Sequence, residues 1–209
     1  MGSTRMSKKR IVITGLGMVS PLGNTVTDNW NNLLAGVSGI GPVTRFDASN
    51  LACQIAGEVK DFDITQYIPA KEARRMDVFI HYGIAAAFQA IEDAGLDNIE
   101  GLDKTRVGVN IGAGIGGLPS IEATGSDVIA GGIRKINPFF IPGSLINLIA
   151  GHVTIMKGYQ GPSYGIVSAC TTGAHCIGDA ARMIAYGDAD IMIAGGAEGA
   201  ICTLGMGGF

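Results

Sequence analysis

The stretch GIVSACTTGAHCIGDAARMI, at residues 165–184, carries the strongest indication of the fold. Its first part, Gly165–Ala169, is short, apolar and partly β-branched, which is typical of a buried strand. The residues that follow, up to Tyr186, are mostly Gly, Ala, Ile and Met, and their small side chains indicate a helix packed on all sides. The stretch therefore predicts a strand that turns directly into a helix, with Cys170 at or next to the first helical position.

Cys170 is a candidate nucleophile because of this position. A sulfur at the start of a helix faces unpaired N–H groups and the positive end of the helix dipole, which favour the thiolate. The same geometry offers the Cys170 N–H to an oxyanion, and the small neighbours Ala169, Thr171 and Gly173 leave room for a substrate. A buried cysteine without a chemical role is also common. Spacing alone leaves both interpretations open.

The rest of the chain alternates strand-like and helix-like segments. The further strand-like runs are Arg10–Gly15, Ile55–Val59, Val107–Gly112 and Ile191–Gly195. Lys71–Ala94 has apolar residues at three- and four-residue steps, which predicts a helix with one buried face, and Gly95 is the expected stop. Strands that alternate with helices predict a layered α/β fold.

The glycines at 112, 114 and 117 match the G-x-G-x-x-G pattern of dinucleotide-binding loops. The context does not fit, because Pro119 interrupts the expected helix and no acidic residue ends a second strand about 20 residues later. We therefore expect a close-packed turn, where backbone lies against backbone or substrate, and no nicotinamide or flavin.

Composition excludes several classes of protein. The 209 residues carry a formal net charge of −3, so no basic excess favours a nucleic-acid partner. Charged residues make up only 16% and hydrophobic ones 47%, which excludes disorder and implies extensive burial. No pair of the four cysteines has C-x-x-C spacing, so we expect no metal site and a reduced, cytoplasmic environment. The uncharged run Ile136–Met156 contains two prolines and is expected to be a buried, broken segment rather than a membrane span.

Both ends of the chain carry an expectation. Residues 1–5 have the composition of an expression-tag remnant ahead of a natural start at Met6. The chain stops at Gly205–Phe209, an apolar, glycine-rich turn, whereas natural ends are usually polar. This ending predicts that a longer protein continues beyond Phe209. None of the three histidines is spaced to serve Cys170, so either the thiol works without one or the histidines lie in that further sequence.

Several motifs together carry a resemblance to a known family. They are VITGLGMVSPLGNT, RRMDVF, IGAGIGG, NPFFIPGSLINLIAG, GPSYGIVSACTTGAHCIGDAARMIAYGDADIMIAGGAE and TLGMGGF. From about Lys8 to Phe209 the chain resembles the N-terminal half of type II β-ketoacyl-[acyl-carrier-protein] synthases, the elongating condensing enzymes of fatty-acid synthesis. The resemblance implies a thiolase-like αβαβα fold in a homodimer. Residues 6–209 would cover about half of a protomer, without the C-terminal half.

The resemblance also implies a reaction. Cys170 would accept an acyl chain from acyl-carrier protein as a thioester and supply an oxyanion N–H. Malonyl-carrier protein would then lose carbon dioxide, and the carbanion would attack the thioester in a Claisen condensation. Two histidines, a lysine and a second oxyanion N–H would come from the other half. No cofactor is expected, because the substrates travel on the phosphopantetheine arm of the carrier protein.

Further site residues are implied by the same resemblance. Gly114, Ile115 and Phe209 match residues that line the acyl tunnel and gate the cysteine, and Phe140 matches one that reaches the partner subunit's acyl pocket. The residues that match a docking patch for the acidic carrier protein are Lys71, Arg74, Arg75, Arg134 and Lys135. A local positive patch can steer an acidic partner despite a negative total charge, although a solvated helix start would have a similar composition.

Two alternatives to a condensing enzyme are considered. One is a non-catalytic partner subunit of the same fold, which the presence of Cys170 disfavours. The other is a truncated half that only binds acyl-carrier protein or a partner subunit. A bare half would also expose an apolar layer, which favours aggregation.

Overall fold

A three-stranded parallel sheet forms the centre of the molecule, as a computed structural model of residues 9–209 shows. Strand β3 (Val107–Gly112) lies between β4 (Ser163–Tyr164) and β5 (Ile191–Gly196), and every residue of β3 is buried. The sequence predicted β3 with the observed bounds and β5 to within one residue. The interpretation of residues 1–5 as a tag remnant and of Met6 as the natural start lies outside the described residues.

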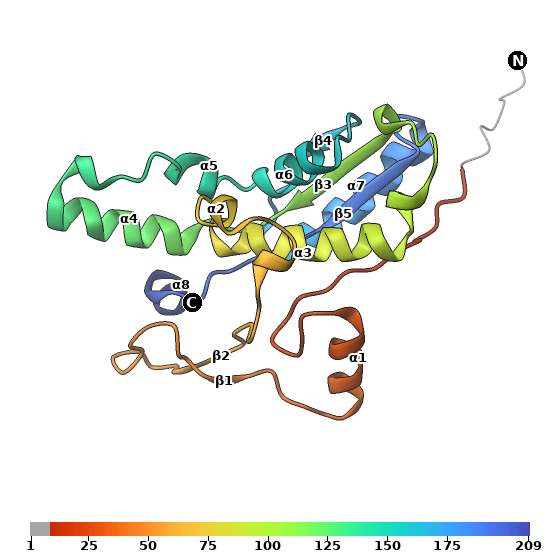
Figure 1. Cartoon of the computed structure of the whole chain (residues 1–209). Helices are drawn as coiled ribbons and strands as arrows, with labels where there is room; N and C mark the ends of the chain where they lie inside the picture. Colours follow the sequence, from red (N-terminus) through yellow and green to blue (C-terminus); the bar gives the residue numbers. More distant parts are fainter. Residues whose placement is uncertain (1–8) are drawn as a thin grey trace, which may run out of the picture.

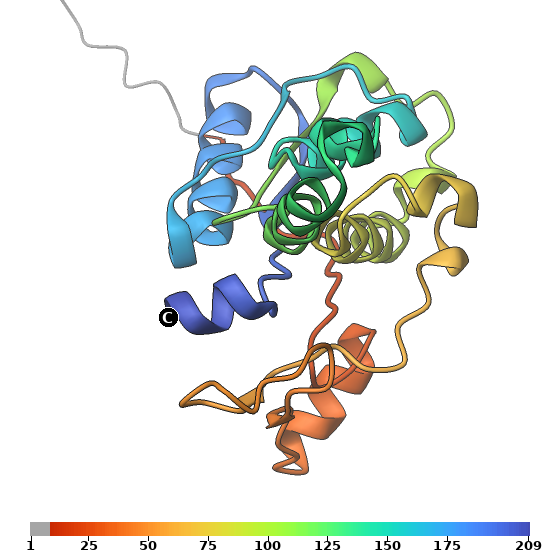
Figure 2. The ribbon, with the colours of Figure 1, turned by 90° about the vertical axis from the view of Figure 1, so that its left-hand side faces the viewer.

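Helices cover both faces of the sheet. Helices α3 (Val78–Asp93) and α6 (Leu148–Lys157) pack on each other on one face, and α7 (Thr172–Tyr186) packs on β3 and β5 from the other (Figures 1 and 2). The core between α3, β3 and α6 is fully buried and apolar; its members include Phe79, Ile80, Ile84, Val107, Val109, Ile149 and Val153. The predicted α/β layering is therefore observed.

The helix expected over Lys71–Ala94 is divided in two. Helix α2 (Ala70–Ala73) ends early, and Asp77 begins α3 anew as its N-cap, since its side chain accepts a hydrogen bond from the Phe79 N–H. The predicted end is observed, because Gly95 has a left-handed φ of 66° directly after the α3 C-cap and opens the short 3₁₀-helix η2 (Leu96–Asn98).

Three predicted strands are wrong or shortened. Arg10–Gly15 joins no ladder; beyond it, the N–H groups of Leu16 and Met18 bond side chains of α3 instead of a strand. Of Ile55–Val59 only β2 (Ile55–Ala56) is a strand, paired with β1 (Gly41–Pro42). Gly165–Ala169 leaves the sheet after β4, because the chain there turns into the next helix.

A lobe below the sheet contains α1 (Val26–Leu34), β1 and β2 (Figure 1). Thr25 caps α1 by accepting from the Asp28 N–H at 3.1 Å. The 3₁₀-helix η1 (Ile64–Gln66) leads the chain back to α2 and α3. The lobe is tied to α3 by a 2.5 Å hydrogen bond from Arg45 Nη2 to the Tyr82 hydroxyl.

An arm extends to one side of the sheet, at the left in Figure 1. It consists of α4 (Leu118–Gly131), η4 (Ile133–Lys135) and α5 (Phe140–Ser144), and α8 (Thr203–Gly208) lies beside α4 (Figure 1). The run 136–156 is broken between α5 and α6, as predicted. It is only partly buried, because Ile141 and Leu145 are exposed on the arm. No helix within residues 9–209 is long and apolar enough to cross a membrane.

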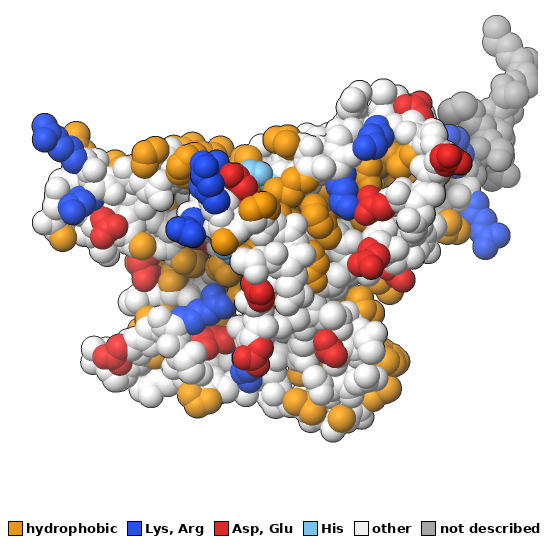
Figure 3. All heavy atoms as spheres, in the orientation of Figure 1, with side chains coloured by type: hydrophobic (Ala, Val, Ile, Leu, Met, Phe, Trp, Pro, Cys, Tyr) orange, Lys and Arg blue, Asp and Glu red, His pale blue; other side chains and the backbone are white. Residues whose placement is uncertain are grey.

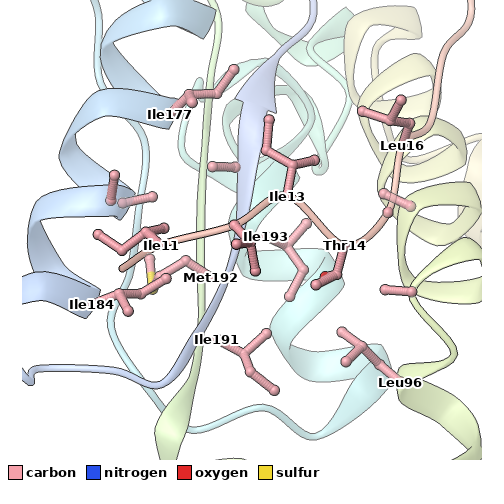
Figure 4. A pocket seen from close by; sticks show the side chains of 17 residues that line it. Ile11, Ile13, Thr14, Leu16, Leu96, Ile177, Ile184, Ile191, Met192 and Ile193 are labelled. Atoms are coloured by element: carbon pink, nitrogen blue, oxygen red, sulfur yellow. The ribbon is translucent and has the colours of Figure 1, made fainter. Parts of the chain in front are cut away.

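An apolar cavity of about 260 Å³ lies between Ile11–Leu16, α7 and β5 (Figure 4). Its lining side chains include Ile13, Ile177, Ile184 and Ile193. Ile13 is 78% exposed, so the apolar segment Arg10–Gly15 forms part of an open apolar surface. This exposure agrees with the expectation of an uncovered apolar layer.

Candidate active site

Cys170 lies in the 3₁₀-turn η5 (Ala169–Thr171), which continues directly into α7. Its side chain is a free, exposed thiol. Ala169, the residue before it, has a φ of 54°, in the left-handed region that non-glycine residues seldom occupy. The backbone thus turns sharply and presents the cysteine at the surface, next to the first helical position as predicted.

Side chains on both sides of the turn hold its shape. The Ser168 N–H donates to the Thr172 hydroxyl at 2.9 Å, and the Thr171 hydroxyl donates to the Ser168 carbonyl at 2.7 Å. His175 Nδ1 lies 2.7 Å from the Ser168 hydroxyl, so this histidine supports the turn from the far side. The hydroxyl groups fix the backbone around Cys170 without contacting its sulfur.

The glycine loop Gly112–Gly117 lies against this turn. A side chain at Gly112 would overlap the Ile166 carbonyl oxygen, and the position of a Cβ on Gly114 is 3.1 Å from the Ala169 carbonyl oxygen. The close backbone approach predicted for these glycines is therefore observed, and it lies beside Cys170. One premise was wrong: α4 does begin directly after Gly117, because Pro119 is tolerated in the first helical turn.

Glu198 also binds the glycine loop. Its Oε2 accepts from the Ile115 N–H at 2.7 Å, and its Oε1 accepts from the Gly116 N–H at 3.2 Å. Sequence reasoning missed this residue. The available signal was that Glu198 is the first charged residue after the apolar β5.

Phe140 and Phe209 belong to segments that are distant from Cys170 in sequence. Phe140 begins α5, and that helix packs on the glycine loop, where the Gly117 N–H donates to the Ser144 carbonyl at 3.2 Å. Phe209 follows α8 and is 95% exposed. The structure therefore connects Phe140 to the loop through α5, but it leaves the Phe209 side chain in the open.

Asp77 is a second residue that sequence reasoning missed. It is 5% exposed, and its Oδ2 accepts from the Ser120 N–H in the first turn of α4 at 2.9 Å. Its own N–H donates to the Gly143 carbonyl of α5 at 3.0 Å. The buried Asp77 thus joins the starts of α3 and α4 through its carboxylate and reaches α5 through its own N–H.

The five basic residues form two groups that differ in their surroundings. Lys71 and Arg74 are exposed on and beside α2, whereas Arg75 is half-buried, pairs with Glu72 at 3.0 Å and lies over the Phe139 ring at 4.5 Å. Arg134 and Lys135 are exposed at the far end of the arm. Figure 3 shows basic side chains over α2 and at the arm's tip on one face.

The other two histidines have their own surroundings. His81 Nε2 lies 2.8 Å from the Ala73 carbonyl; burial lowers its pKa, against smaller opposing effects of that carbonyl and of Asp77. Burial also lowers the pKa of His152, against the charge of Glu72. Within residues 9–209 no group of three or more His, Cys, Asp or Glu side chains could hold a metal ion.

The sequence matches the family described as beta-ketoacyl synthase, N-terminal domain, over residues 8–209. The chain belongs to this family. The ketoacyl synthase domain is 56% identical over 204 residues to 3-oxoacyl-[acyl-carrier-protein] synthase 2 of Vibrio harveyi, which covers 98% of the chain and 49% of the relative. It is 44% identical over 201 residues to the protein of the same name from Staphylococcus aureus strain N315, with 96% and 48% covered. The domain thus spans about half the length of these relatives.

Solved structures agree with the sequence relatives. The domain superposes on a type II polyketide ketosynthase, solved with its acyl-carrier protein and a bound hexaketide, with a TM-score of 0.82 and 28% identity over 96% of this chain and 54% of that one. It superposes on the ishigamide ketosynthase/chain length factor with a TM-score of 0.81 and 26% identity, over 92% and 48%. The fold is therefore the thiolase-like α/β fold expected from the resemblance, and the chain covers about half of it.

Proposed function

We propose that this chain is the nucleophile-bearing half of a 3-oxoacyl-[acyl-carrier-protein] synthase that elongates fatty acids. The observation that carries the proposal is the placement of Cys170. It is an exposed thiol on a sharp turn that leads into α7, and the glycine loop packs closely against this turn. The 56% identity to the V. harveyi synthase supports this class of reaction.

The first chemical step uses residues of this chain. The Cys170 thiolate attacks the carbonyl carbon of an acyl thioester on the phosphopantetheine arm of acyl-carrier protein. A new C–S bond forms, the carrier's sulfur leaves with the electron pair of the broken bond, and it takes up a proton. The N–H of Cys170 lies in the first turn, where no intrahelical acceptor is due to it, and it stabilises the oxyanion of the tetrahedral intermediate.

The second step needs groups beyond those found beside Cys170. Malonyl-carrier protein loses carbon dioxide, and the resulting carbanion displaces the Cys170 sulfur to give 3-oxoacyl-carrier protein. His175 is engaged with Ser168 and His81 with Ala73, so neither serves this step in the proposal. In this proposal, the remaining catalytic groups belong to the half of the relatives' sequence that this chain does not cover.

The substrate and its carrier are assigned to separate surfaces. The path of the acyl chain is lined and gated by Gly114, Ile115, Phe140 and Phe209. Of these, Phe140 is directed to the second protomer of a homodimer. The carrier protein docks on the basic groups at Lys71, Arg74, Arg75, Arg134 and Lys135. All reactants arrive on carrier protein, so the proposed reaction uses no cofactor. The protein acts in the cytoplasm, in keeping with its four free cysteines.

Intact mass spectrometry tests this proposal. The chain and its Cys170→Ala variant are incubated with long-chain acyl-carrier protein, alone and with the second half of the V. harveyi relative added. We expect a mass gain of one acyl group on the wild-type chain only. If the wild-type chain gains no mass in either condition, the catalytic role of Cys170 is wrong and a half that only binds carrier protein or a partner remains.

A further inference from the structure

The glycine loop holds two N–H groups that point at one carboxylate. The Ile115 and Gly116 N–H groups donate to the two oxygens of the same carboxylate, so they converge on one side of the loop. Consecutive N–H groups in such a turn form a concave site for an anion. Glu198 supplies that anion from a segment 83 residues away in sequence from Ile115.

The segment that carries Glu198 is itself fixed. It follows β5, and the Ala197 N–H donates to the Gly112 carbonyl at 3.0 Å. The segment after β5 therefore contacts the loop at its first residue as well as at Ile115 and Gly116. The ion pairs formed within residues 9–209 use other acidic residues, which leaves the carboxylate of Glu198 to the loop.

Glu198 and the turn that presents Cys170 both lie against the glycine loop. The position of a Cβ on Gly114 is 3.1 Å from Glu198 Oε2 and 3.1 Å from the Ala169 carbonyl oxygen. The carboxylate and the carbonyl that precedes Cys170 therefore both lie close to the Gly114 backbone. Because Glu198 accepts from the Ile115 and Gly116 N–H groups, it holds the loop backbone at Ile115.

We propose that Glu198 is a positioning residue for chain-length specificity: it holds the loop so that Ile115 limits the space beside the acyl chain on Cys170. This inference rests on the proposed function, because it assigns the acyl chain to the surface next to Ile115. Glu198 does not touch the reacting atoms in this proposal. It acts through two backbone N–H groups.

The first experiment needs no activity. Amide hydrogen exchange is measured by NMR on the wild-type chain, on Glu198→Gln and on the control Glu100→Gln, whose side chain is exposed. Glutamine keeps one acceptor oxygen and places an NH₂ group against the second N–H. We expect exchange at Ile115 or Gly116 to rise about tenfold, since charge-assisted hydrogen bonds are among the stronger ones. Gly117 donates to Ser144 instead and serves as an internal control. Unchanged exchange at both amides overturns the proposal.

The second experiment measures specificity. The same variants, mixed with the second half of the V. harveyi relative, are acylated from carrier protein bearing chains of four to sixteen carbons, and the long-to-short ratio on Cys170 is determined by mass spectrometry. We expect the ratio to change at least threefold in Glu198→Gln, with iodoacetamide labelling of Cys170 within twofold of wild type. An unchanged ratio in an acylated protein overturns the specificity role alone. A wild-type protein that no donor acylates overturns the proposed function, and the specificity role with it.

Discussion

At the scale of single residues, the turn before Cys170 depends on Ala169, whose φ of 54° disfavours side chains branched at Cβ. A non-glycine residue in this region costs roughly 1–2 kcal/mol. Glycine would remove that cost, but it also gains freedom in the unfolded chain, which offsets about 0.4–1 kcal/mol. The residue at 169 therefore decides how strained the turn before Cys170 is.

We expect Ala169→Val to lower the free energy of unfolding by at least ~1 kcal/mol relative to Ala169→Gly, because valine is branched and strongly disfavoured at positive φ. Urea unfolding of the two variants, followed by circular dichroism, measures the difference. Equal stabilities would show that position 169 changes its backbone conformation without cost.

Gly112 and Gly125 offer a matched pair of glycines. We expect Gly112→Ala to destabilise the chain by about 1–3 kcal/mol, as overpacking does, because its Cβ would overlap the Ile166 carbonyl and lie 2.8 Å from Thr172 Cγ2. Gly125 lies in α4, and a Cβ added there would meet nothing within 4 Å besides its chain neighbours and the backbone of its own helix, so we expect Gly125→Ala to gain roughly 0.5–1 kcal/mol from helix propensity. Urea unfolding of both variants gives the two signs, and a tolerated Gly112→Ala would contradict the close backbone approach at the site.

At the scale of elements, α4 holds α8 through Glu122. The carboxylate accepts from the Thr203 and Leu204 N–H groups at 3.3 and 2.5 Å, where α8 begins. Burial raises the pKa of Glu122, but hydrogen bonds from Leu204, Cys202 and Thr203 outweigh it, and the net pKa lies below the ordinary value of 4.5. A depressed pKa means that the ionised form stabilises the contact.

The contact between α4 and α8 is therefore expected to depend on pH. Its contribution is fully present above pH 4.5 and is lost as the pH falls through the lower pKa of the folded state. NMR titration of the Leu204 amide should give a midpoint below 4.5, and Glu122→Gln should abolish that titration. A midpoint at or above 4.5 would contradict the role of Glu122.

At the scale of the whole molecule, large apolar side chains remain exposed on the arm. Ile129 is 89% and Ile133 78% exposed, close together at the end of α4 and in η4. Contiguous exposed apolar surface of this kind favours association. The open cavity beside Ile13 adds to this surface at the other end of the molecule.

We expect the double substitution Ile129→Lys with Ile133→Lys to reduce self-association in sedimentation velocity. Stability should change by no more than about 0.5 kcal/mol, since neither side chain is buried. Thr27→Lys with Asn98→Lys, at two exposed polar positions, gives the same change in charge as a control. Equal reduction by the control pair would assign the effect to net charge rather than to the apolar arm.

The charge distribution leads to a prediction about docking. Lys71 and Arg74 are exposed, whereas Arg75 already pairs with Glu72 and Phe139. Lys71→Ala and Arg74→Ala should therefore slow acylation of Cys170 at low carrier concentration, with a loss that shrinks as salt rises. Acylation rates across salt concentrations measure this, with Lys60→Ala in the distant lobe as the control. A loss independent of salt would argue against electrostatic docking.

Part of the fold and site could be predicted from local pattern. Val107–Gly112 and Ile191–Gly195 are almost wholly apolar, which is typical of strands in a covered parallel sheet; β3 is fully buried, and β5 is mostly half-buried. Gly95 ended its helix because it reaches positive φ at little cost. Cys170 could be singled out because a strand-like run, a reactive side chain and a helix follow one another within a few residues.

The sequence by itself therefore determined which segments are apolar enough for the core, where α3 stops, and that Cys170 lies at the turn that leads into α7. Only the tertiary structure decided that Arg10–Gly15 joins no ladder, that Asp77 joins α3 to α4 and α5, and that Glu198 binds the loop at Ile115. The physical reason is the separation in sequence between the residues that interact. Burial and helix ends follow from neighbouring side chains, whereas strand pairing and bonds such as Glu198 to Ile115 join segments far apart in the chain, so they exist only once the chain has folded.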